Sequence, residues 1–260
     1  MRNFQKSILQ NKWQKYKSEK ELVIFSGYTR EYKGEKLYKY YSFDCCPDKM
    51  FAPIINKTLR YRTPMSFNDP YDCYIAANLN QSITSVRETE MKEVLVCSLT
   101  ETDNDILMWS HYASSHKGFV VEYDMKKLNE INERQIEIFS HVEYSDSIVY
   151  RSFSAQDSDK DIVQAIYHKS LCWEYEKEVR SVVYGSPDSI GGEYKDVQLP
   201  EESISAVILG SYFMSETKGN IPSILKPWYE GYKLHYMQLQ ADKYKLERKK
   251  DFKEEWFSET

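Results

Sequence analysis

"VLVCSLTETDNDILMWSHYASSHKGFVVEYD", residues 94–124, carries the pattern of a strand, a helix and a second strand. The apolar run at its start predicts a buried strand, and "GFVVEYD" at its end predicts another. Between them, Asp103 or Asn104 is the expected cap of a helix that begins near Asp105 and ends at about Ser115. The segment therefore predicts a fold that combines strands with helices.

The rest of the chain continues this mixture of strand-like and helix-like segments. Apolar runs predict further strands at Leu37–Phe43, Leu59–Arg62, 136–144, 178–185, Ile204–Gly210 and 232–240. Helical spacing predicts helices over 1–22, about 84–92 and from 158 onward. Because no repeat or low-complexity linker divides the chain, we expect one α+β domain with a mixed, mostly antiparallel sheet flanked by helices. It comprises an N-terminal helical extension (1–35), a core (36–212), and a C-terminal strand with a charged helix (213–260).

The composition is that of a folded protein. Of its 260 residues, 41% are hydrophobic and 29% are charged, which excludes a disordered chain. No apolar run approaches the ~18 residues of a membrane span, and the N-terminal segment lacks the apolar core of a signal peptide. We therefore expect a cytoplasmic protein that has no membrane partner.

Charge, cysteines and glycines narrow the function classes. The formal net charge of −5 lacks the basic surplus of a protein that grips long nucleic acids, although local basic clusters leave a nucleic-acid target open. The five cysteines are irregularly spaced and form no CxxC pair, so we expect reduced thiols and no metal. The glycine-rich motifs of Rossmann, P-loop and α/β-hydrolase enzymes are all absent from the sequence.

The first candidate site lies in the expected helix of the opening segment. His111 and His116 are five residues apart, which places them about 140° apart around a helix axis and argues against a shared metal. Trp109, Tyr112 and His116 follow one another at three- and four-residue steps along one face. A packed and hydrogen-bonded core face explains this pattern, and so does a pocket in which His111 is catalytic and Trp109 and Tyr112 bind substrate.

The second candidate is "WEYEKEVRSVV", residues 173–183. In an extended chain, alternate residues share one face, which brings together Glu174, Glu176, Glu178 and Arg180. Like charges in proximity raise the pKa of a carboxyl group and an arginine lowers it, so one glutamate could hold a proton or orient a sugar hydroxyl. We take Glu176 and Glu178 as candidate catalytic residues and Arg180 as a binding residue. The structural alternative is an ion-pair ladder.

The third candidate is "LRYRTPMSFNDPYD", residues 59–72. Arg60 and Arg62 share one face of the expected strand, and guanidinium groups bind phosphates and carboxylates with two hydrogen bonds. Surface ion pairs are the alternative. Asn68 and Asp69 are further binding candidates, or they stabilise the loop by bonding their own backbone.

Six segments in this order resemble the bacterial family called domain of unknown function 2971. They are "LYKYYSF", "TLRYRTPMSFNDPYDC", residues 94–124, "VEYSD", "KSLCWEYEKEVRSVV" and "ISAVILG", which together extend from Leu37 to Gly210. The resemblance brings no settled activity with it.

The layout is also similar to that of the ADP-ribosyltransferases. The matching elements are Leu37-Tyr38-Lys39, the region from Trp109 to Tyr112, and Glu176-Lys177-Glu178. The resemblance implies NAD as substrate, aromatic side chains stacked on nicotinamide, and a glutamate bonded to the ribose 2′-hydroxyl. The sequence departs from the pattern because Lys39 stands where arginine or histidine is expected, and a Ser-Thr-Ser strand is missing from it.

Three functional hypotheses follow. The first is a nucleotide- or NAD-directed enzyme, an ADP-ribosyltransferase or NAD glycohydrolase-like bacterial effector of a defence or toxin system. It uses Glu176 or Glu178, with Lys39 among the binding residues. The second is a nucleic-acid-directed effector or nuclease that uses Arg60, Arg62 and His111. The third is a non-catalytic sensor or interaction module. A protein target and the oligomeric state are left open.

Overall fold

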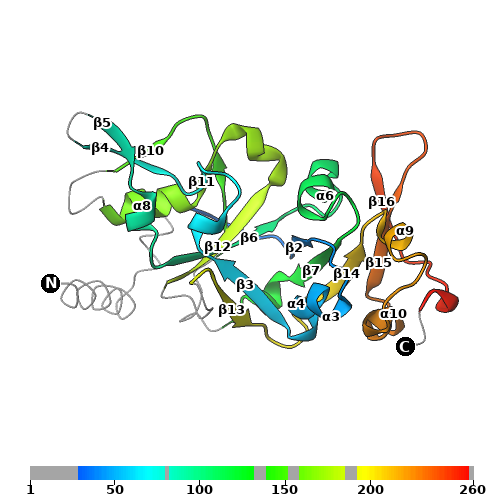
Figure 1. The fold of residues 1–260 in the computed structure, drawn as a ribbon. Helices are drawn as coiled ribbons and strands as arrows, with labels where there is room; N and C mark the ends of the chain where they lie inside the picture. Colours follow the sequence, from blue (N-terminus) through cyan, green and yellow to red (C-terminus); the bar gives the residue numbers. More distant parts are fainter. Residues whose placement is uncertain (1–28, 80–81, 132–138, 152–157, 185–191, 258–260) are drawn as a thin grey trace.

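A computed structural model describes residues 29–79, 82–131, 139–151, 158–184 and 192–257 (Figure 1). Within these residues, eleven strands form one sheet in the order β1-β8-β12-β6-β2-β7-β14-β15-β16, with β3 and β13 attached through β6. The strands are β1 (Arg30–Glu31), β2 (Lys36–Tyr41), β3 (Thr58–Arg62), β6 (Val94–Thr100), β7 (Phe119–Asp124), β8 (Ser140–His141), β12 (Glu178–Tyr184), β13 (Tyr194–Gln198), β14 (Ile204–Leu209), β15 (Leu234–Leu239) and β16 (Leu246–Lys249).

The sheet is mixed and mostly antiparallel, as the sequence predicts. β6 forms antiparallel pairs with β12, β2 and β3, and the parallel contact in this sheet is between β14 and β15. β6 and β7 carry nearly continuous apolar residues because side chains on both of their faces are buried. The α+β fold class is therefore confirmed.

Helices cover the two faces of the sheet, and the side chains of β2 show how. Leu37 and Tyr41 pack on the face that carries α3 (Pro47–Met50) and α4 (Ala52–Ile55). Tyr38 and Tyr40 pack on the opposite face with α6 (Ile106–Tyr112). Figure 1 shows α6 on one side of the sheet and α3 and α4 on the other. Two-residue alternation along the strand thus builds two separate cores.

A smaller structure stands at the end of the sheet opposite β15 and β16 (Figure 1). It has a three-stranded sheet and a helix whose side chains share one apolar core. Its elements are β4 (Ile75–Leu79), β5 (Ser82–Ser85), β10 (Val149–Tyr150) and α8 (Ser158–Ile166). A separate pair joins β9 (Glu143–Tyr144) to β11 (His168–Lys169), and β11 supplies a lysine to the site described below.

Residues 94–124 form the expected strand–helix–strand unit, with two differences at the helix ends. The N-cap of α6 is Asp105, whose Oδ1 accepts hydrogen bonds from the backbone N–H groups of Leu107 and Met108, so the expectation of Asp103 or Asn104 was wrong. The helix stops at Tyr112 because the next turn is left-handed, with positive φ at Ser114, Ser115 and His116.

Other expectations have mixed outcomes. The prediction of a charged C-terminal helix was wrong, since β16 occupies that segment, with Leu246 buried, Glu247 exposed, and Arg248 and Lys249 partly buried. Residues 87–90 form the short helix α5 (Arg87–Glu90), whereas the preceding residues form β5. The helix expected over 1–22 lies outside the described residues. Within the part of the chain that the structure describes, no helix is long and apolar enough to cross a membrane.

Candidate functional site

Five buried charged residues meet where β11, β12 and the 3-10 helix η2 (Leu171–Glu176) come together. They are called the charge network here: Asp72, Lys169, Glu176, Glu178 and Arg180. Arg180 is fully buried and donates hydrogen bonds from Nε and Nη2 to the two carboxylate oxygens of Glu178 at 2.7 and 2.9 Å. Its Nη2 also donates to Asp72 Oδ1 at 2.7 Å. Such a planar fork holds two carboxylates in fixed orientations.

Lys169 completes the charge network from the side of β11. Its Nζ donates to Glu176 Oε2 and, at 3.0 Å, to Glu178 Oε2, and it lies 3.4 Å from Asp72 Oδ2. Three carboxylates thus face two cations, so the network has a charge of −1 when all five groups are ionised. A buried excess charge is costly unless a proton or a ligand compensates it.

The strand predicted over 178–185 is β12, which begins at Glu178 as expected. The extended conformation considered for 173–177 is not formed, because the 3-10 helix η2 occupies 171–176. Lys177 between them has a left-handed backbone, with φ of 44°. Glu174 is therefore exposed, while Glu176 and Glu178 both reach Lys169. A non-glycine residue in this conformation carries strain that the surrounding contacts must offset.

The two buried glutamates differ in acidity. Burial, followed by the charge of Glu178, raises the pKa of Glu176 above its ordinary value, against the opposing effect of Lys169. Burial acts on Glu178 too, but Arg180 and Lys169 outweigh it and hold the pKa of that carboxyl below its ordinary value. Neighbouring carboxylates with separated pKa values are the arrangement that enzymes use to assign acid and base roles.

An aromatic cluster stands beside Glu176: His111, Tyr112, Trp173 and Tyr175. The Tyr112 hydroxyl donates to Glu176 Oε1, and burial together with that carboxylate raises the pKa of Tyr112, which keeps it a hydrogen-bond donor. His111 Nδ1 lies 3.0 Å from the Tyr175 hydroxyl, and the Trp173 and Tyr175 rings have centroids 6.1 Å apart. Aromatic faces of this kind can stack on bases or sugars.

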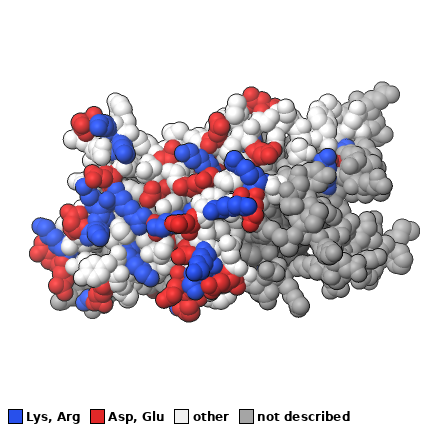
Figure 2. All heavy atoms as spheres, turned by 180° about the vertical axis from the view of Figure 1, so that it is seen from behind, with Lys and Arg blue, Asp and Glu red and all other residues white. Residues whose placement is uncertain are grey.

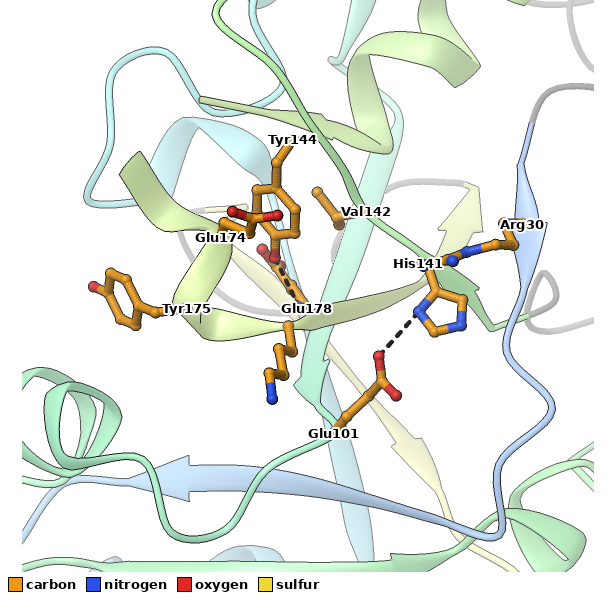
Figure 3. A pocket seen from close by; sticks show the side chains of 9 residues that line it. Arg30, Glu101, His141, Val142, Tyr144, Glu174, Tyr175 and Glu178 are labelled. Carbon is orange, nitrogen blue, oxygen red and sulfur yellow. Dashed lines mark hydrogen bonds and ion pairs between the residues drawn. The ribbon is translucent and has the colours of Figure 1, made fainter. Parts of the chain in front are cut away.

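A cavity of about 530 Å³ borders the charge network and the aromatic cluster, and Glu178 and Tyr175 line it. Figure 3 shows Tyr144 and Glu178 on one side, joined by a hydrogen bond from the Glu178 backbone N–H to the Tyr144 hydroxyl. His141 and Glu101 lie on the other side. This volume falls within the range of small-molecule sites.

Comparison with known proteins adds one match. Residues 108–181 match the family described as Protein of unknown function (DUF2971). No curated protein and no solved structure matches the chain. The DUF2971 segment runs from α6 to β12 and so contains the aromatic cluster and four members of the charge network, Asp72 being the fifth.

Other residues that the sequence singled out lie elsewhere or pack in the core. Trp109 is fully buried beneath α6 and donates from Nε1 to the Asp103 carbonyl. Lys39 donates to the Ser98 carbonyl on β6. Arg60 is paired with Asp196 of β13 through two hydrogen bonds of 2.7 Å. These contacts support the structural alternatives for Trp109 and Arg60.

The remaining candidates from the sequence are Asn68 and Asp69, in the loop after β3, and Arg62 on β3. The side chain of Asn68 forms a hydrogen bond with the Tyr112 hydroxyl, which places Asn68 at the aromatic cluster. Asp69 accepts a hydrogen bond from the Tyr71 backbone, the loop-stabilising role considered above. Arg62 is exposed on β3. The structure therefore brings His111, Tyr112 and Asn68 together with the two glutamates and Arg180, whereas its contacts leave Arg60 and Lys39 outside this group.

Sequence reasoning missed Asp72, Lys169 and the pair of His141 and Glu101. Asp72 ends the "FNDPYD" motif and Lys169 opens "KSLCWEYEKEVR", so both lay within quoted segments. Asp72 contacts Lys169 and Arg180, which follow it by 97 and 108 positions, and no local pattern reports contacts across such separations.

The described residues also bear on metal binding and nucleic-acid binding. In the described ranges, no group of three or more His, Cys, Asp or Glu side chains is arranged to hold a metal ion. Figure 2 shows Lys and Arg interspersed with Asp and Glu over one face of the molecule. A mixed surface of this kind differs from the basic stripe of a phosphate-backbone binder.

Proposed function

We propose that this protein is an enzyme that acts on a nucleotide, with NAD as the substrate to test first, and that Glu176 is its principal carboxylate. The observation that carries the proposal is the position of Glu176. It belongs to a buried network with excess negative charge, and it accepts a hydrogen bond from Tyr112 of the aromatic cluster. Its chain neighbours Tyr175 and Lys177 line a cavity of nucleotide size.

The chemistry that suits this arrangement is cleavage of a bond between a sugar carbon and a ring nitrogen. As the bond from ribose C1′ to the nicotinamide nitrogen breaks, its electron pair leaves with nicotinamide and positive charge develops on the ribose. A carboxylate beside the sugar stabilises that charge and accepts a hydrogen bond from the 2′-hydroxyl. Water, or an acceptor group on a target, then bonds to C1′ and loses a proton.

Other parts of the site have matching roles. Tyr175, the member of the aromatic cluster that lines the cavity, stacks on the base, while Arg30 and Lys177 at the cavity attract the phosphates. Arg180 and Lys169 hold the pKa of Glu178 below its ordinary value, whereas burial raises the pKa of Glu176, so the two carboxyl groups have different roles. The activity is either NAD hydrolysis or ADP-ribosyl transfer, and an effector of a defence or toxin system would use either.

The deciding experiment compares wild-type protein with Glu176→Gln. Each protein is incubated with NAD and with ATP, released nicotinamide is measured by chromatography, and labelled NAD reports transfer to protein. Glu176→Gln should lower the rate by about 10²–10³-fold, because it removes a charge that stabilises the transition state. Tyr112→Phe, which removes one hydroxyl and keeps the ring, should lower it less.

Folding and binding are checked in the same series. Glu130→Gln is the matched control, since Glu130 is an exposed carboxylate paired with Lys127, and its rate should equal that of wild type. Loss of the folded state in Glu176→Gln with full activity in Tyr112→Phe would assign Glu176 a structural ion pair. Binding of a nucleotide without turnover would instead indicate a sensor module and contradict the proposal.

A further inference from the structure

The cavity holds a second polar pair, on the side away from Tyr144. His141 Nδ1 lies 3.1 Å from Glu101 Oε1, and the two side chains are 16% and 36% exposed. Both line the cavity, and Figure 3 draws the contact between them. The pair stands outside the charge network and takes no part in the chemistry proposed for Glu176.

The backbone holds both residues in place. His141 lies on β8, where it pairs with Arg30 of β1 on one side and with Val179 of β12 on the other. The backbone N–H of Glu101 donates to the Lys177 carbonyl at 3.2 Å, which ties it to the turn between the two buried glutamates. His141 is therefore held between two strands, and Glu101 is held at the end of β6, which restricts the movement of the pair.

The contact fixes the protonation pattern of the imidazole. A carboxylate accepts a hydrogen bond and cannot donate one, so Nδ1 carries the proton and Nε2 of the neutral ring carries the lone pair. Burial lowers the pKa of His141 below its ordinary value of 6.5, with Arg30 acting in the same direction and Glu101 opposing. The ring is thus neutral at physiological pH and can accept a proton.

The groups that face His141 come from each element packed against it. Arg30 lies opposite on β1, and the Tyr32 ring meets the imidazole edge-on with centroids 5.3 Å apart. Glu101 follows β6, and β12 contributes the apolar Val179. A carboxylate bonded to Nδ1 stabilises the imidazolium that forms when Nε2 takes up a proton.

We propose that His141 is the proton acceptor for the nucleophile that attacks the substrate in the cavity, and that Glu101 positions it. The inference rests on the proposed function. The oxygen of water, or of a hydroxyl on a target, bonds to ribose C1′ while the bond to the nicotinamide nitrogen breaks with its electron pair. The proton of that oxygen passes to Nε2 of His141 and then to solvent.

The test measures NAD consumption against pH for wild type, His141→Asn and Glu101→Gln. Wild-type activity should rise with pH through a value below 6.5, the ordinary pKa of the imidazole. His141→Asn should lower the rate by roughly 10²–10⁴-fold and remove that rise. Glu101→Gln should move the rise to lower pH, because Glu101 raises the pKa of His141, and should also slow the reaction. Glu101→Asp should recover part of the lost rate.

A direct titration of the His141 imidazole by NMR links the rate profile to this residue, because the rise of activity with pH should follow the imidazole pKa in both wild type and Glu101→Gln, which a merely structural role would not produce. Glu101→Gln should lower the imidazole pKa, whereas His235→Asn, a substitution on β15, should leave both that pKa and the reaction rate unchanged. Wild-type rate and pH profile in His141→Asn, with activity abolished in Glu176→Gln, would overturn this inference and leave the proposed function standing. Wild-type protein that consumes no nucleotide would overturn the proposed function, and the role of His141 would fall with it.

Discussion

Replacing Lys169 by methionine is the sharpest test of the charge network. Lys169 is 6% exposed and its ammonium group contacts all three buried carboxylates, Glu176, Glu178 and Asp72. Methionine fills similar volume without charge, so Arg180 alone would remain to compensate three negative groups. Removing one partner from a buried ion pair costs about 3–5 kcal/mol.

That cost is large for a single domain, whose total stability is about 5–15 kcal/mol. It corresponds to a fall of roughly 6–20 °C in the melting temperature, measured by calorimetry or circular dichroism. Lys127→Met is the matched control, because it breaks the exposed pair with Glu130 and should change stability by less than about 1 kcal/mol.

The pH dependence tests the cause. Without Lys169, the carboxylates repel one another most when all are ionised, so the loss should be greatest at neutral pH. It should shrink as the pH falls and Glu176, whose pKa burial and Glu178 already raise, takes up a proton. Lys169→Met combined with Glu176→Gln should recover part of the stability at neutral pH. A Lys169→Met protein as stable as wild type would refute this account and show that the fold does not need the lysine.

Two further predictions concern residues outside the site. Burial opposes ionisation of Glu122, but hydrogen bonds from Arg248, Lys36 and Ser205 lower its pKa to about 2. The stability that the ionised Glu122 contributes is therefore present above its ordinary pKa of 4.5 and is lost as the pH falls toward about 2. Glu122→Gln should therefore lose stability less steeply than wild type over that range in acid-unfolding curves, and a parallel loss would contradict this. Gly118→Ala would place its Cβ 2.0 Å from the Tyr41 carbonyl oxygen, so overpacking should lower the free energy of unfolding by about 1–3 kcal/mol, measured by urea unfolding. An unchanged unfolding midpoint would show that the strand can shift to make room.

Local pattern determined much of the fold. The apolar run of β6, the helix that follows and the strand β7 were all predicted, because hydrophobic periodicity and capping act within a few residues. The start of β12 at Glu178 was predicted as well, but the conformation of the residues before it was not determined by their pattern. An extended chain was considered for 173–177, whereas these residues form a 3-10 helix and a left-handed Lys177, with Glu176 bonded to Lys169 and Tyr112.

The sequence by itself determined the fold class, most strands, the position of α6 and the choice of Glu176 and Glu178 as candidates. The tertiary structure alone decided which groups surround them. Asp72 reaches Lys169 and Arg180, and Lys169 reaches Glu176, only because the loop after β3 and the strand β11 converge on β12. Likewise, Glu101 and His141 become a pair only through the pairing of β6, β12 and β8. Ion pairs and hydrogen bonds form between groups that lie a few ångströms apart in space, and the number of residues between two groups in the sequence does not give that distance.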